Sequence, residues 1–268
     1  MTKTILITGA TDGIGLATAK VLAALGHTVL LHGRSTAKLA DAEALIAGLA
    51  DMGGVETYLA DLSRMAEVEA LAKAVAGRHD RLDVLINNAG VYNAPDAVTA
   101  DGLDVRFAVN TIAPYLLTRR LLPLLGAGGR VINLSSAAQA PVDADALAGR
   151  TRLADGAAYA QSKLAITMWT RAMAEALGPD GPAVIAVNPG SLLGSKMVKE
   201  AFGMDGKDIG IGADILCRAA LDDAFADASG QYFDNDSGHF APPHPDAQDA
   251  RKCDAMLRAI DAALAALA

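Results

Sequence analysis

Thr8-Gly9-Ala10-Thr11-Asp12-Gly13-Ile14-Gly15 is the stretch of sequence that decides the fold. An aliphatic run precedes it, and a helical run over residues 16–25 follows it. In a strand-turn-helix unit, Gly9 permits the sharp exit from the strand, Gly13 lets backbone amides approach a pyrophosphate, and Gly15 allows close helix packing. The N-terminus of the helix then faces the anion. The spacing is GxxxGxG rather than GxGxxG, so a tight turn without a ligand stays open as the alternative.

Short β-branched and aliphatic runs recur along the whole chain. Between the first six lie stretches with apolar residues at helical spacing, such as Leu39, Ile46 and Leu49. Apolar strands that alternate with helices predict a parallel sheet covered by helices on both faces. The sequence therefore predicts a single-domain α/β Rossmann fold, with a doubly wound, seven-stranded parallel sheet. The expected strands are residues 4–8, 28–32, 55–59, 82–86, 130–134, 183–187 and 231–233.

Composition and charge limit the class of protein. The chain has 268 residues, 52% of them hydrophobic, and a formal net charge of -8, which fits one domain over residues 1–268. The charge argues against nucleic acid or an anionic membrane as a partner. Residues 1–10 are too short for a signal-peptide core, and charges interrupt the later apolar runs, so we expect a cytoplasmic protein. Cys217 and Cys253 fit neither a disulfide framework nor a zinc site, and we expect no metal.

The residues after the second expected strand bear on cofactor choice. His32-Gly33-Arg34-Ser35 stands where an NAD enzyme places an acid for the ribose 2′-hydroxyl, about 20 residues after the glycine turn. Arg34 can form a bidentate pair with a 2′-phosphate, which favours NADP(H). Asp12 argues the other way, because an acid in the turn would repel that phosphate. NAD(H), and an Arg34 that simply ends the strand in solvent, stay open as alternatives.

Tyr159 and Lys163 stand four residues apart in a segment with helix-forming residues through Leu177, which puts them on one helix face. A free tyrosine titrates near pH ~10, and we expect the Lys163 ammonium to lower the pKa of Tyr159. Its phenol would then exchange a proton with a carbonyl or alcohol oxygen while a nicotinamide exchanges hydride. Ser136, at the end of the fifth strand, can hydrogen-bond the same oxygen, and strand alternation turns Ser135 to the other side.

Further motifs accompany these residues in order. Asn87-Asn88-Ala89-Gly90 follows the fourth expected strand, Asn110 lies in the long helix after it, and Asn188-Pro189-Gly190 follows the sixth strand. Together with the glycine turn, Ser136 and the Tyr-Lys pair, this set resembles the short-chain dehydrogenase/reductase superfamily over residues 4–190.

The resemblance implies a role for each matching position. Asn88, Ala89 and Gly90 would line the cofactor, and Lys163 would also hold the nicotinamide ribose. Asn110 would position a water in a proton relay to Lys163, the alternative being a helix amide whose hydrogen bonds are satisfied by the protein. The implied catalytic residues are Asn110, Ser136, Tyr159 and Lys163. The implied cofactor-binding residues are Gly9, Thr11, Asp12, Gly13, Ile14, Gly15, Arg34, Asp61, Leu62, Asn88, Ala89, Gly90, Tyr159, Lys163, Pro189 and Gly190.

Two features depart from the commonest members of the family. The interval from Ser136 to Tyr159 is long, with an insertion at 140–157, and together with residues 229–233 it looks like the retinol-dehydrogenase-like and carbonyl-reductase-like branches. In some such relatives this insertion alters helix-to-helix assembly, so the usual tetramer is in doubt and the chain is a candidate homo-oligomer of open size. Where the family often has a threonine after Pro-Gly, Ser195 can substitute, one residue late.

Residues 190–212 carry six glycines and several large apolar side chains. This composition suits a mobile lid over a bulky, mostly apolar carbonyl or alcohol, and a surface loop packed on the sheet edge is the alternative. His239 and His244 can border the same pocket. A C-terminal helix is expected at about 245–267.

The sequence thus predicts an NAD(P)H-dependent oxidoreductase that interconverts a carbonyl and an alcohol, with NADP(H) preferred. A non-catalytic NADP(H)-binding sensor or scaffold is the alternative from another class. It would need the glycine turn but would have no use for Ser136, Tyr159 and Lys163 together. An epimerase or dehydratase with tightly held NAD is the alternative among enzymes, and the short C-terminal region counts against it.

Overall fold

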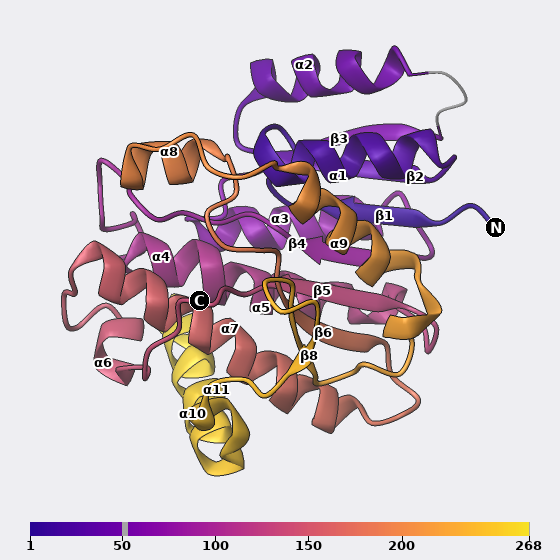
Figure 1. The fold of residues 1–268 in the computed structure, drawn as a ribbon. Helices are drawn as coiled ribbons and strands as arrows, with labels where there is room; N and C mark the ends of the chain where they lie inside the picture. Colours follow the sequence, from indigo (N-terminus) through magenta and orange to yellow (C-terminus); the bar gives the residue numbers. More distant parts are fainter. Residues whose placement is uncertain (50–52, 268) are drawn as a thin grey trace.

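The structure is a computed structural model that describes residues 1–49 and 53–267 (Figure 1). Its centre is one eight-stranded sheet in the order β3-β2-β1-β4-β5-β6-β7-β8. Strands β1 to β7 are parallel, and β8 is antiparallel to β7. The strands are β1 Thr4–Ile7, β2 Thr28–Gly33, β3 Val55–Leu59, β4 Val84–Asn87, β5 Arg130–Leu134, β6 Ala183–Asn188, β7 Tyr232–Asp234 and β8 His239–Ala241.

The expected seven strands are all present, with ends that move by at most two residues. The number of strands was wrong, because β8 adds an eighth strand and makes the sheet mixed at one edge. β8 is only three residues long and lies among glycine, histidine and proline, so the sequence has no apolar run there that would predict a strand. A short turn containing Gly238, with φ +77°, joins it to β7, and so tight a connection permits only antiparallel pairing.

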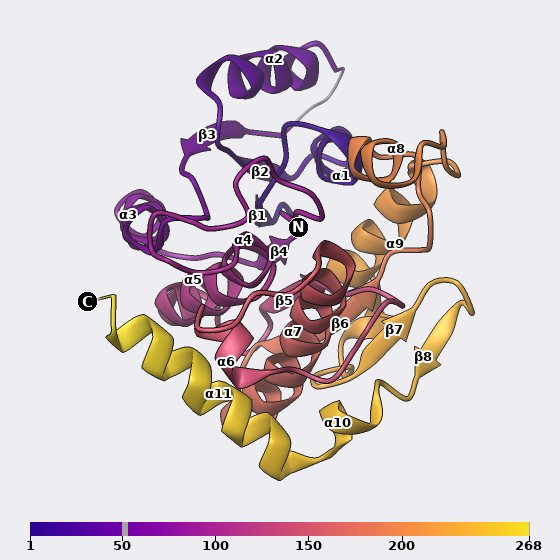
Figure 2. The same cartoon turned by 90° about the vertical axis from the view of Figure 1, so that its left-hand side faces the viewer.

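Helices cover both faces of the sheet (Figure 2), as the doubly wound prediction requires. One buried cluster joins the sheet to α1, α2 and α9, and the other joins it to α3, α5, α7 and α11. Both clusters share one sheet, so the chain forms a single domain. The helices are α1 Gly13–Ala24, α2 Thr36–Ala47, α3 Met65–Ala76, α4 Val105–Phe107, α5 Ala113–Leu121, α6 Ala144–Leu147, α7 Asp155–Leu177, α8 Lys196–Phe202, α9 Gly210–Leu221, α10 Pro245–Gln248 and α11 Ala250–Ala265, with a π-helical turn η1 Ala108–Ile112 and 3-10 turns η2 Leu122–Leu124 and η3 Asp223–Phe225.

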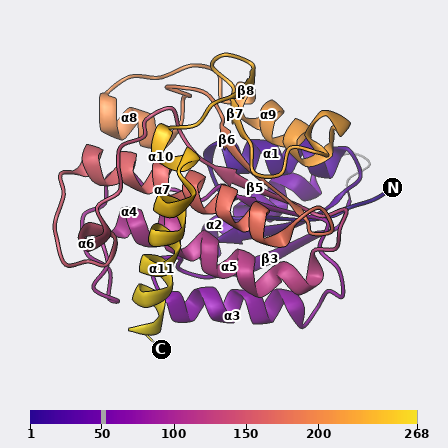
Figure 3. The same ribbon diagram turned by 90° about the horizontal axis from the view of Figure 1, so that it is seen from below.

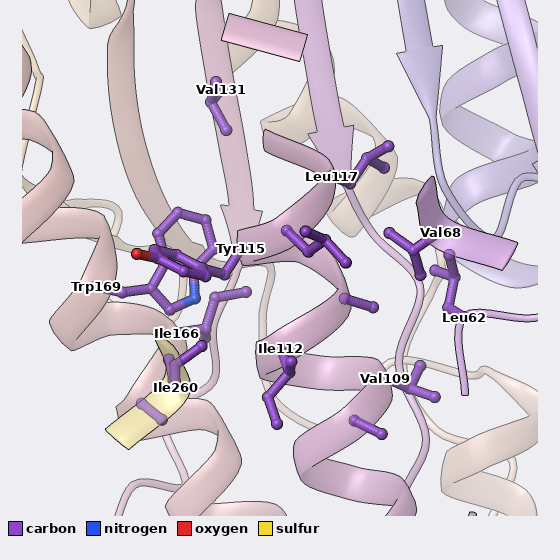
Figure 4. Close-up of a cluster of buried hydrophobic side chains, with 14 of the residues drawn as sticks. Leu62, Val68, Val109, Ile112, Tyr115, Leu117, Val131, Ile166, Trp169 and Ile260 are labelled. Atoms are coloured by element: carbon purple, nitrogen blue, oxygen red, sulfur yellow. The ribbon is translucent and has the colours of Figure 1, made fainter. Parts of the chain in front are cut away.

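Aromatic side chains fill the core between α5 and α7 (Figure 4). Tyr115 of α5 meets Trp169 of α7 edge to face, with ring centroids 5.8 Å apart and planes at 67°. Ile260 of α11 is fully buried in the same cluster. α11 runs across α7 (Figure 3), so the C-terminal helix completes this core.

The expected single helix at about 245–267 is two helices, α10 and α11. Asp249 separates them with φ -93° and ψ 106°, which is not helical. Its carboxylate accepts hydrogen bonds from the backbone N–H groups of Arg251 and Lys252 and so caps α11. An aspartate that bonds the backbone ahead of it starts a helix and interrupts the one before.

The carboxyl ends of β1, β4, β5 and β6 all meet at one edge of the sheet, because these strands are parallel. The glycine turn, the Asn87–Gly90 segment, the two serines and the Asn188–Gly190 segment follow these four strands in turn. Ligands of doubly wound sheets bind at such an edge, where the strand order reverses between β1 and β4.

Residues 190–212 form an ordered excursion at this edge. Leu193 pairs with Lys207, and backbone hydrogen bonds of 2.7 Å join Gly194 N to Lys207 O and Lys207 N to Leu192 O. The residues between Leu193 and Lys207 include α8. The expected loop is therefore closed at its base by this pairing and contains a helix. In residues 1–49 and 53–267, no helix is long and apolar enough to cross a membrane.

Candidate active site

The glycine turn after β1 is too tight for side chains at its central positions. Gly9 and Gly13 have φ of +65° and +56°, in the region that favours glycine. A Cβ on Gly15 would lie 2.3 Å from the Gly9 carbonyl oxygen and 2.4 Å from Asn88 Nδ2. Asn88 Nδ2 donates to the carbonyls of Thr8 and Gly9 at 2.8 and 3.0 Å, and so fastens the turn to the end of β4.

Asp12 caps the helix that follows this turn. Its Oδ1 accepts a hydrogen bond of 2.8 Å from the backbone N–H of Gly13. Its other oxygen lies 3.4 Å from Nζ of Lys38, a residue of α2. The expected repulsion between Asp12 and a 2′-phosphate is therefore offset by a cation that the sequence analysis did not single out.

His32 holds the turn from the neighbouring strand β2. Its Nδ1 accepts from the Gly9 N–H at 3.2 Å, which places the ring proton on Nε2, 3.0 Å from the Ala60 carbonyl oxygen. Burial lowers the pKa of His32 to about 4. The neutral imidazole thus links the phosphate-binding turn to the end of β3.

A pocket of about 560 Å³ opens at this edge of the sheet. Most of the expected cofactor-binding residues line it together, namely Gly9, Thr11, Asp12, Gly13, Ile14, Arg34, Asp61, Leu62, Asn88, Ala89, Gly90, Tyr159, Lys163 and Pro189. Gly15 lies beneath the turn, and Gly190 is outside the lining. Of the expected catalytic residues, Tyr159 and Lys163 line the pocket, whereas Ser136 and Asn110 are not in the lining, which includes Ser135 instead.

Lys163 lies deep beside Tyr159. Its Nζ donates to the Leu134 carbonyl at 2.7 Å and stands 5.7 Å from the centroid of the Tyr159 ring. Burial lowers the pKa of Lys163 to about 8. The lysine therefore holds its proton less tightly than a surface lysine does.

The expectation of a lowered pKa for Tyr159 was wrong for this arrangement. Burial raises the pKa of Tyr159, and the side-chain hydrogen bond with Ser136 only partly opposes this effect. The ammonium of Lys163 faces the ring rather than pairing with the hydroxyl, because it is hydrogen-bonded to the end of β5. The phenol is thus protonated at neutral pH.

The two adjacent serines point in different directions. Ser135 is buried, and its Oγ bonds Thr167 Oγ1 at 2.6 Å and the Lys163 carbonyl at 3.2 Å. Ser136 Oγ accepts from the Ala138 N–H at 3.1 Å, and its hydroxyl is near enough to Tyr159 to lower the pKa of the phenol. The geometry thus favours Ser136 over Ser135 as the serine beside the phenol.

Asn110 lies in the π-helical turn η1, a rare geometry that often occurs at functional sites. Its Oδ1 accepts from the Val91 N–H at 2.8 Å, and its Nδ2 donates to the Val91 carbonyl and to Ser162 Oγ, both at 3.0 Å. The side chain therefore braces α7 against the segment after β4. Both polar atoms of the side chain thus have protein partners, and these lie outside the helix that carries Asn110.

Several residues that the sequence analysis did not select line the pocket, among them Ser35, Lys38, Tyr92, Lys196 and Glu200. Tyr92 packs on Tyr159, with ring centroids 5.0 Å apart and planes at 51°. The sequence feature that could have identified Tyr92 as a pocket residue is its position directly after Gly90 and Val91. Ser195 also lines the pocket and caps α8.

His239 and His244 do not border the pocket. His239 lies exposed in β8, and His244 caps α10 by accepting from the Asp246 N–H. Both cysteines are free and buried, as expected, and burial raises the pKa of each thiol. The described part of the chain contains no group of three or more histidine, cysteine or acidic side chains that could hold a metal.

Comparisons with known proteins define the class. Residues 3–205 match the short chain dehydrogenase family. Retinol dehydrogenase 13 of Homo sapiens is 34% identical over 266 residues, which cover 92% of this chain and 80% of the relative. The chain therefore belongs to the short-chain dehydrogenase/reductase family of oxidoreductases, and the predicted retinol-dehydrogenase-like branch is confirmed.

Solved structures agree with this assignment. An uncharacterized protein from Mycobacterium paratuberculosis superposes with a TM-score of 0.79 at 28% identity, over 97% of this chain and 92% of that one. The landomycin C-6 ketoreductase LanV, solved with bound NADP and rabelomycin, has a TM-score of 0.68 at 30% identity, over 87% and 94% of the two chains.

Proposed function

We propose that this oxidoreductase interconverts a carbonyl and an alcohol with NADP(H), on a bulky and mostly apolar substrate. One observation carries the proposal: Tyr159 and Lys163 line one part of a pocket whose lining also includes the glycine turn, Arg34 and Lys38. A single ligand that extends from the two cations to the phenol has the chemistry of NADP(H).

The residues present fit that cofactor. Gly13 brings no side chain of its own to the N-terminus of α1, where the nearest side chains, Ile209 and Ser195, would lie 3.7 and 3.9 Å from a Cβ, so a pyrophosphate can approach the backbone there. Arg34 is exposed at the pocket and forms no ion pair with any residue in the described ranges. Ser35 and Lys38 stand beside it at the start of α2, so a 2′-phosphate would meet two cations and a helix N-terminus.

The bound cofactor supplies or accepts the hydride. During reduction, the neutral phenol of Tyr159 donates its proton to the oxygen of the substrate carbonyl. Lys163 stabilises the negative charge that develops on the phenol, and Ser136 orients the hydroxyl through its hydrogen bond. Alcohol oxidation uses the same groups in reverse.

The segment over residues 190–212 is the proposed substrate lid. Met197 and Glu200 of α8 line the pocket together with Tyr92, so its lining includes aromatic and aliphatic surface. The relatives named above, one a retinol dehydrogenase and one a ketoreductase with bound rabelomycin, support a large apolar substrate. We also propose a cytoplasmic location, supported by the net charge of -8.

The first test is a fluorescence titration with NADPH and with NADH. We expect tighter binding of NADPH, and about tenfold or greater weakening by Arg34→Ala, since a charged hydrogen bond contributes about 1.5–3 kcal/mol. Lys38→Ala is the companion variant. Lys252→Ala on α11, away from the pocket, is the control and keeps wild-type binding. A preference for NADH would overturn the choice of cofactor.

Turnover is tested with a panel of aromatic aldehydes, quinones and ketosteroids. Tyr159→Phe keeps NADPH binding and loses turnover, because only the hydroxyl is removed. Tight NADPH binding without turnover on the panel would favour the alternative function, a non-catalytic NADP(H)-binding sensor or scaffold.

A further inference from the structure

The helix that carries the proposed acid begins without a capping side chain. α7 starts at Asp155, and the preceding residue, Ala154, offers no side-chain hydrogen bond to the free N–H groups of the first turn. Uncapped helix ends fray. Tyr159 follows this turn directly, so its position depends on contacts that other parts of the molecule make with the turn.

Arg106 makes the strongest of these contacts. It belongs to α4, and its side chain is 1% exposed. Its Nη1 lies 2.9 Å from Asp155 Oδ1, and its Nη2 lies 2.8 Å from Oδ2 of the buried Asp104. The side chain of Asp155 is 57% exposed, so the pair joins a buried cation to an accessible first-turn residue.

Stability alone does not explain this buried cation. Moving a guanidinium out of water is costly, and a buried ion pair often stabilises no more than apolar side chains of the same volume. The Nε atom of Arg106 is also buried and has no hydrogen-bond partner among the described residues, which adds to the cost. What the arrangement provides is a fixed distance between α4 and the first turn of α7.

The same segment holds α7 a second time, past Tyr159. α4 continues directly into the π-helical turn η1. From this turn, Asn110 Nδ2 donates to Ser162 Oγ at 3.0 Å, and Thr111 Oγ1 donates to the Ser162 carbonyl at 2.9 Å. Residues 104–111 therefore contact α7 at two positions, Asp155 and Ser162, and Tyr159 lies between these positions in the helix.

Tyr92 closes the turn from the pocket side. A Cβ on Gly156 would lie 3.1 Å from the Tyr92 hydroxyl oxygen, so this ring packs closely on the first turn as well as on Tyr159. With Arg106 on one flank and Tyr92 on the other, the turn has little freedom to shift.

We propose that Arg106 is a positioning residue for the reduction: through Asp155 it holds the first turn of α7, and thereby the Tyr159 hydroxyl, in line with Ser136 and the substrate oxygen. The inference rests on the proposed function. Proton transfer demands this geometry, because a displacement of about 1 Å can lower a rate by about 100-fold.

The test uses the exposed partner, since its loss disturbs the core least. Asp155→Ala removes the contact while leaving a good helix former, and Asp155→Glu retains a carboxylate. Asp145→Ala is the matched control, because Asp145 is also a first-turn aspartate paired with an arginine, and its side chain in α6 is 61% exposed. We expect Asp155→Ala to lower kcat about tenfold with unchanged NADPH affinity and unchanged KM, Asp155→Glu to recover most of the rate, and Asp145→Ala to match the wild type.

Hydrogen exchange supplies a readout that needs no turnover. The backbone amides of residues 158–160, where the hydrogen bonds of α7 begin with Ala158 N–H to the Ala154 carbonyl, exchange faster in Asp155→Ala than in the wild type or in Asp145→Ala. An active wild type with wild-type kcat in Asp155→Ala would overturn the inference and leave the proposed function standing. A kcat loss that Asp155→Glu does not recover would also overturn it. A wild type that reduces no carbonyl contradicts the proposed function. Unchanged hydrogen exchange in Asp155→Ala separately refutes the proposal that Arg106 holds the first turn of α7 through Asp155.

Discussion

At the residue scale, burial acts in opposite directions on the two side chains of the proposed proton transfer, Tyr159 and Lys163. It raises the pKa of Tyr159 and lowers that of Lys163 to about 8. Removal from water disfavours whichever form is charged, which is the phenolate of one and the ammonium of the other. The pair is therefore suited to proton donation at neutral pH.

The pKa of Lys163 sets an alkaline limit to reduction. As the pH rises through about 8, Lys163 loses the charge that stabilises the developing phenolate, so we expect kcat for carbonyl reduction to fall above this pH. The measurement is kcat from about pH 6 to about pH 10. Lys163→Arg, which stays protonated, has a lower rate without the decline near pH 8, and a flat wild-type profile would contradict the assignment.

His32 makes stability depend on pH in the acid range. Its folded pKa of about 4 lies below the ordinary value of 6.5, so the unfolded chain binds the proton more readily. The contribution to stability is complete above pH 6.5 and is lost as the pH falls towards 4. The gap corresponds to about 3 kcal/mol in the free energy of unfolding.

Urea unfolding at several pH values checks this prediction. His32→Asn is less stable at neutral pH but loses less stability on acidification than the wild type. His239→Asn, at an exposed histidine, keeps the wild-type dependence. Equal slopes in the wild type and His32→Asn would rule out the role of His32.

At the scale of elements, the site is a set of close approaches between segments. α1 comes so near to the strand ends that a single added carbon does not fit at Gly15. The π-helical turn brings Asn110 to both Val91 and Ser162, and so sets the separation of α7 from the segment after β4.

In Gly15→Ala, two physical effects on stability act in opposite directions. Helix propensity alone would stabilise the variant by about 1 kcal/mol, because Gly15 is inside α1. The new Cβ would instead lie 2.3 Å from the Gly9 carbonyl oxygen, so we expect a net loss of about 1–3 kcal/mol and weaker NADPH binding. Thermal unfolding and cofactor titration measure both. Gly126→Ala, with no atom within 4 Å of the new Cβ, should be neutral, and a more stable Gly15→Ala would refute the packing argument.

At the scale of the whole molecule, the C-terminal helix is part of the core that supports the catalytic helix. α11 packs on α7 (Figure 3), and its residues Cys253, Met256 and Ile260 are buried in the cluster to which α7 also contributes. An ion pair of 2.6 Å between Asp261 and Arg119 ties it to α5 as well. α11 therefore covers helices that carry or neighbour the site.

Ile260→Ala measures this support. Truncating a fully buried isoleucine leaves a cavity, and we expect a loss of about 2–5 kcal/mol in the free energy of unfolding. Arg258→Ala, on the exposed face of the same helix, should change stability little. Similar losses in both variants would mean that α11 is packed less closely than described.

Local signals in the sequence account for most of the fold. Aliphatic runs, the glycine turn and the four-residue spacing of Tyr159 and Lys163 each depend on neighbours in the chain, and these predicted the seven parallel strands and the residues that meet at one edge. β8 and the helix break at Asp249 were not predicted. Each is too short to show hydrophobic periodicity, and each depends on one turn or one capping residue.

The amino-acid sequence by itself determined the Rossmann fold, the family and the candidate residues, since backbone preference and apolar periodicity are written in short stretches. Only the tertiary structure decided that Lys38 pairs with Asp12, that His32 holds the glycine turn, and that Arg106 reaches Asp155 across 49 positions. It also decided the direction of the Tyr159 pKa. These features depend on burial and on distances between residues far apart in the chain, and no local pattern carries that information.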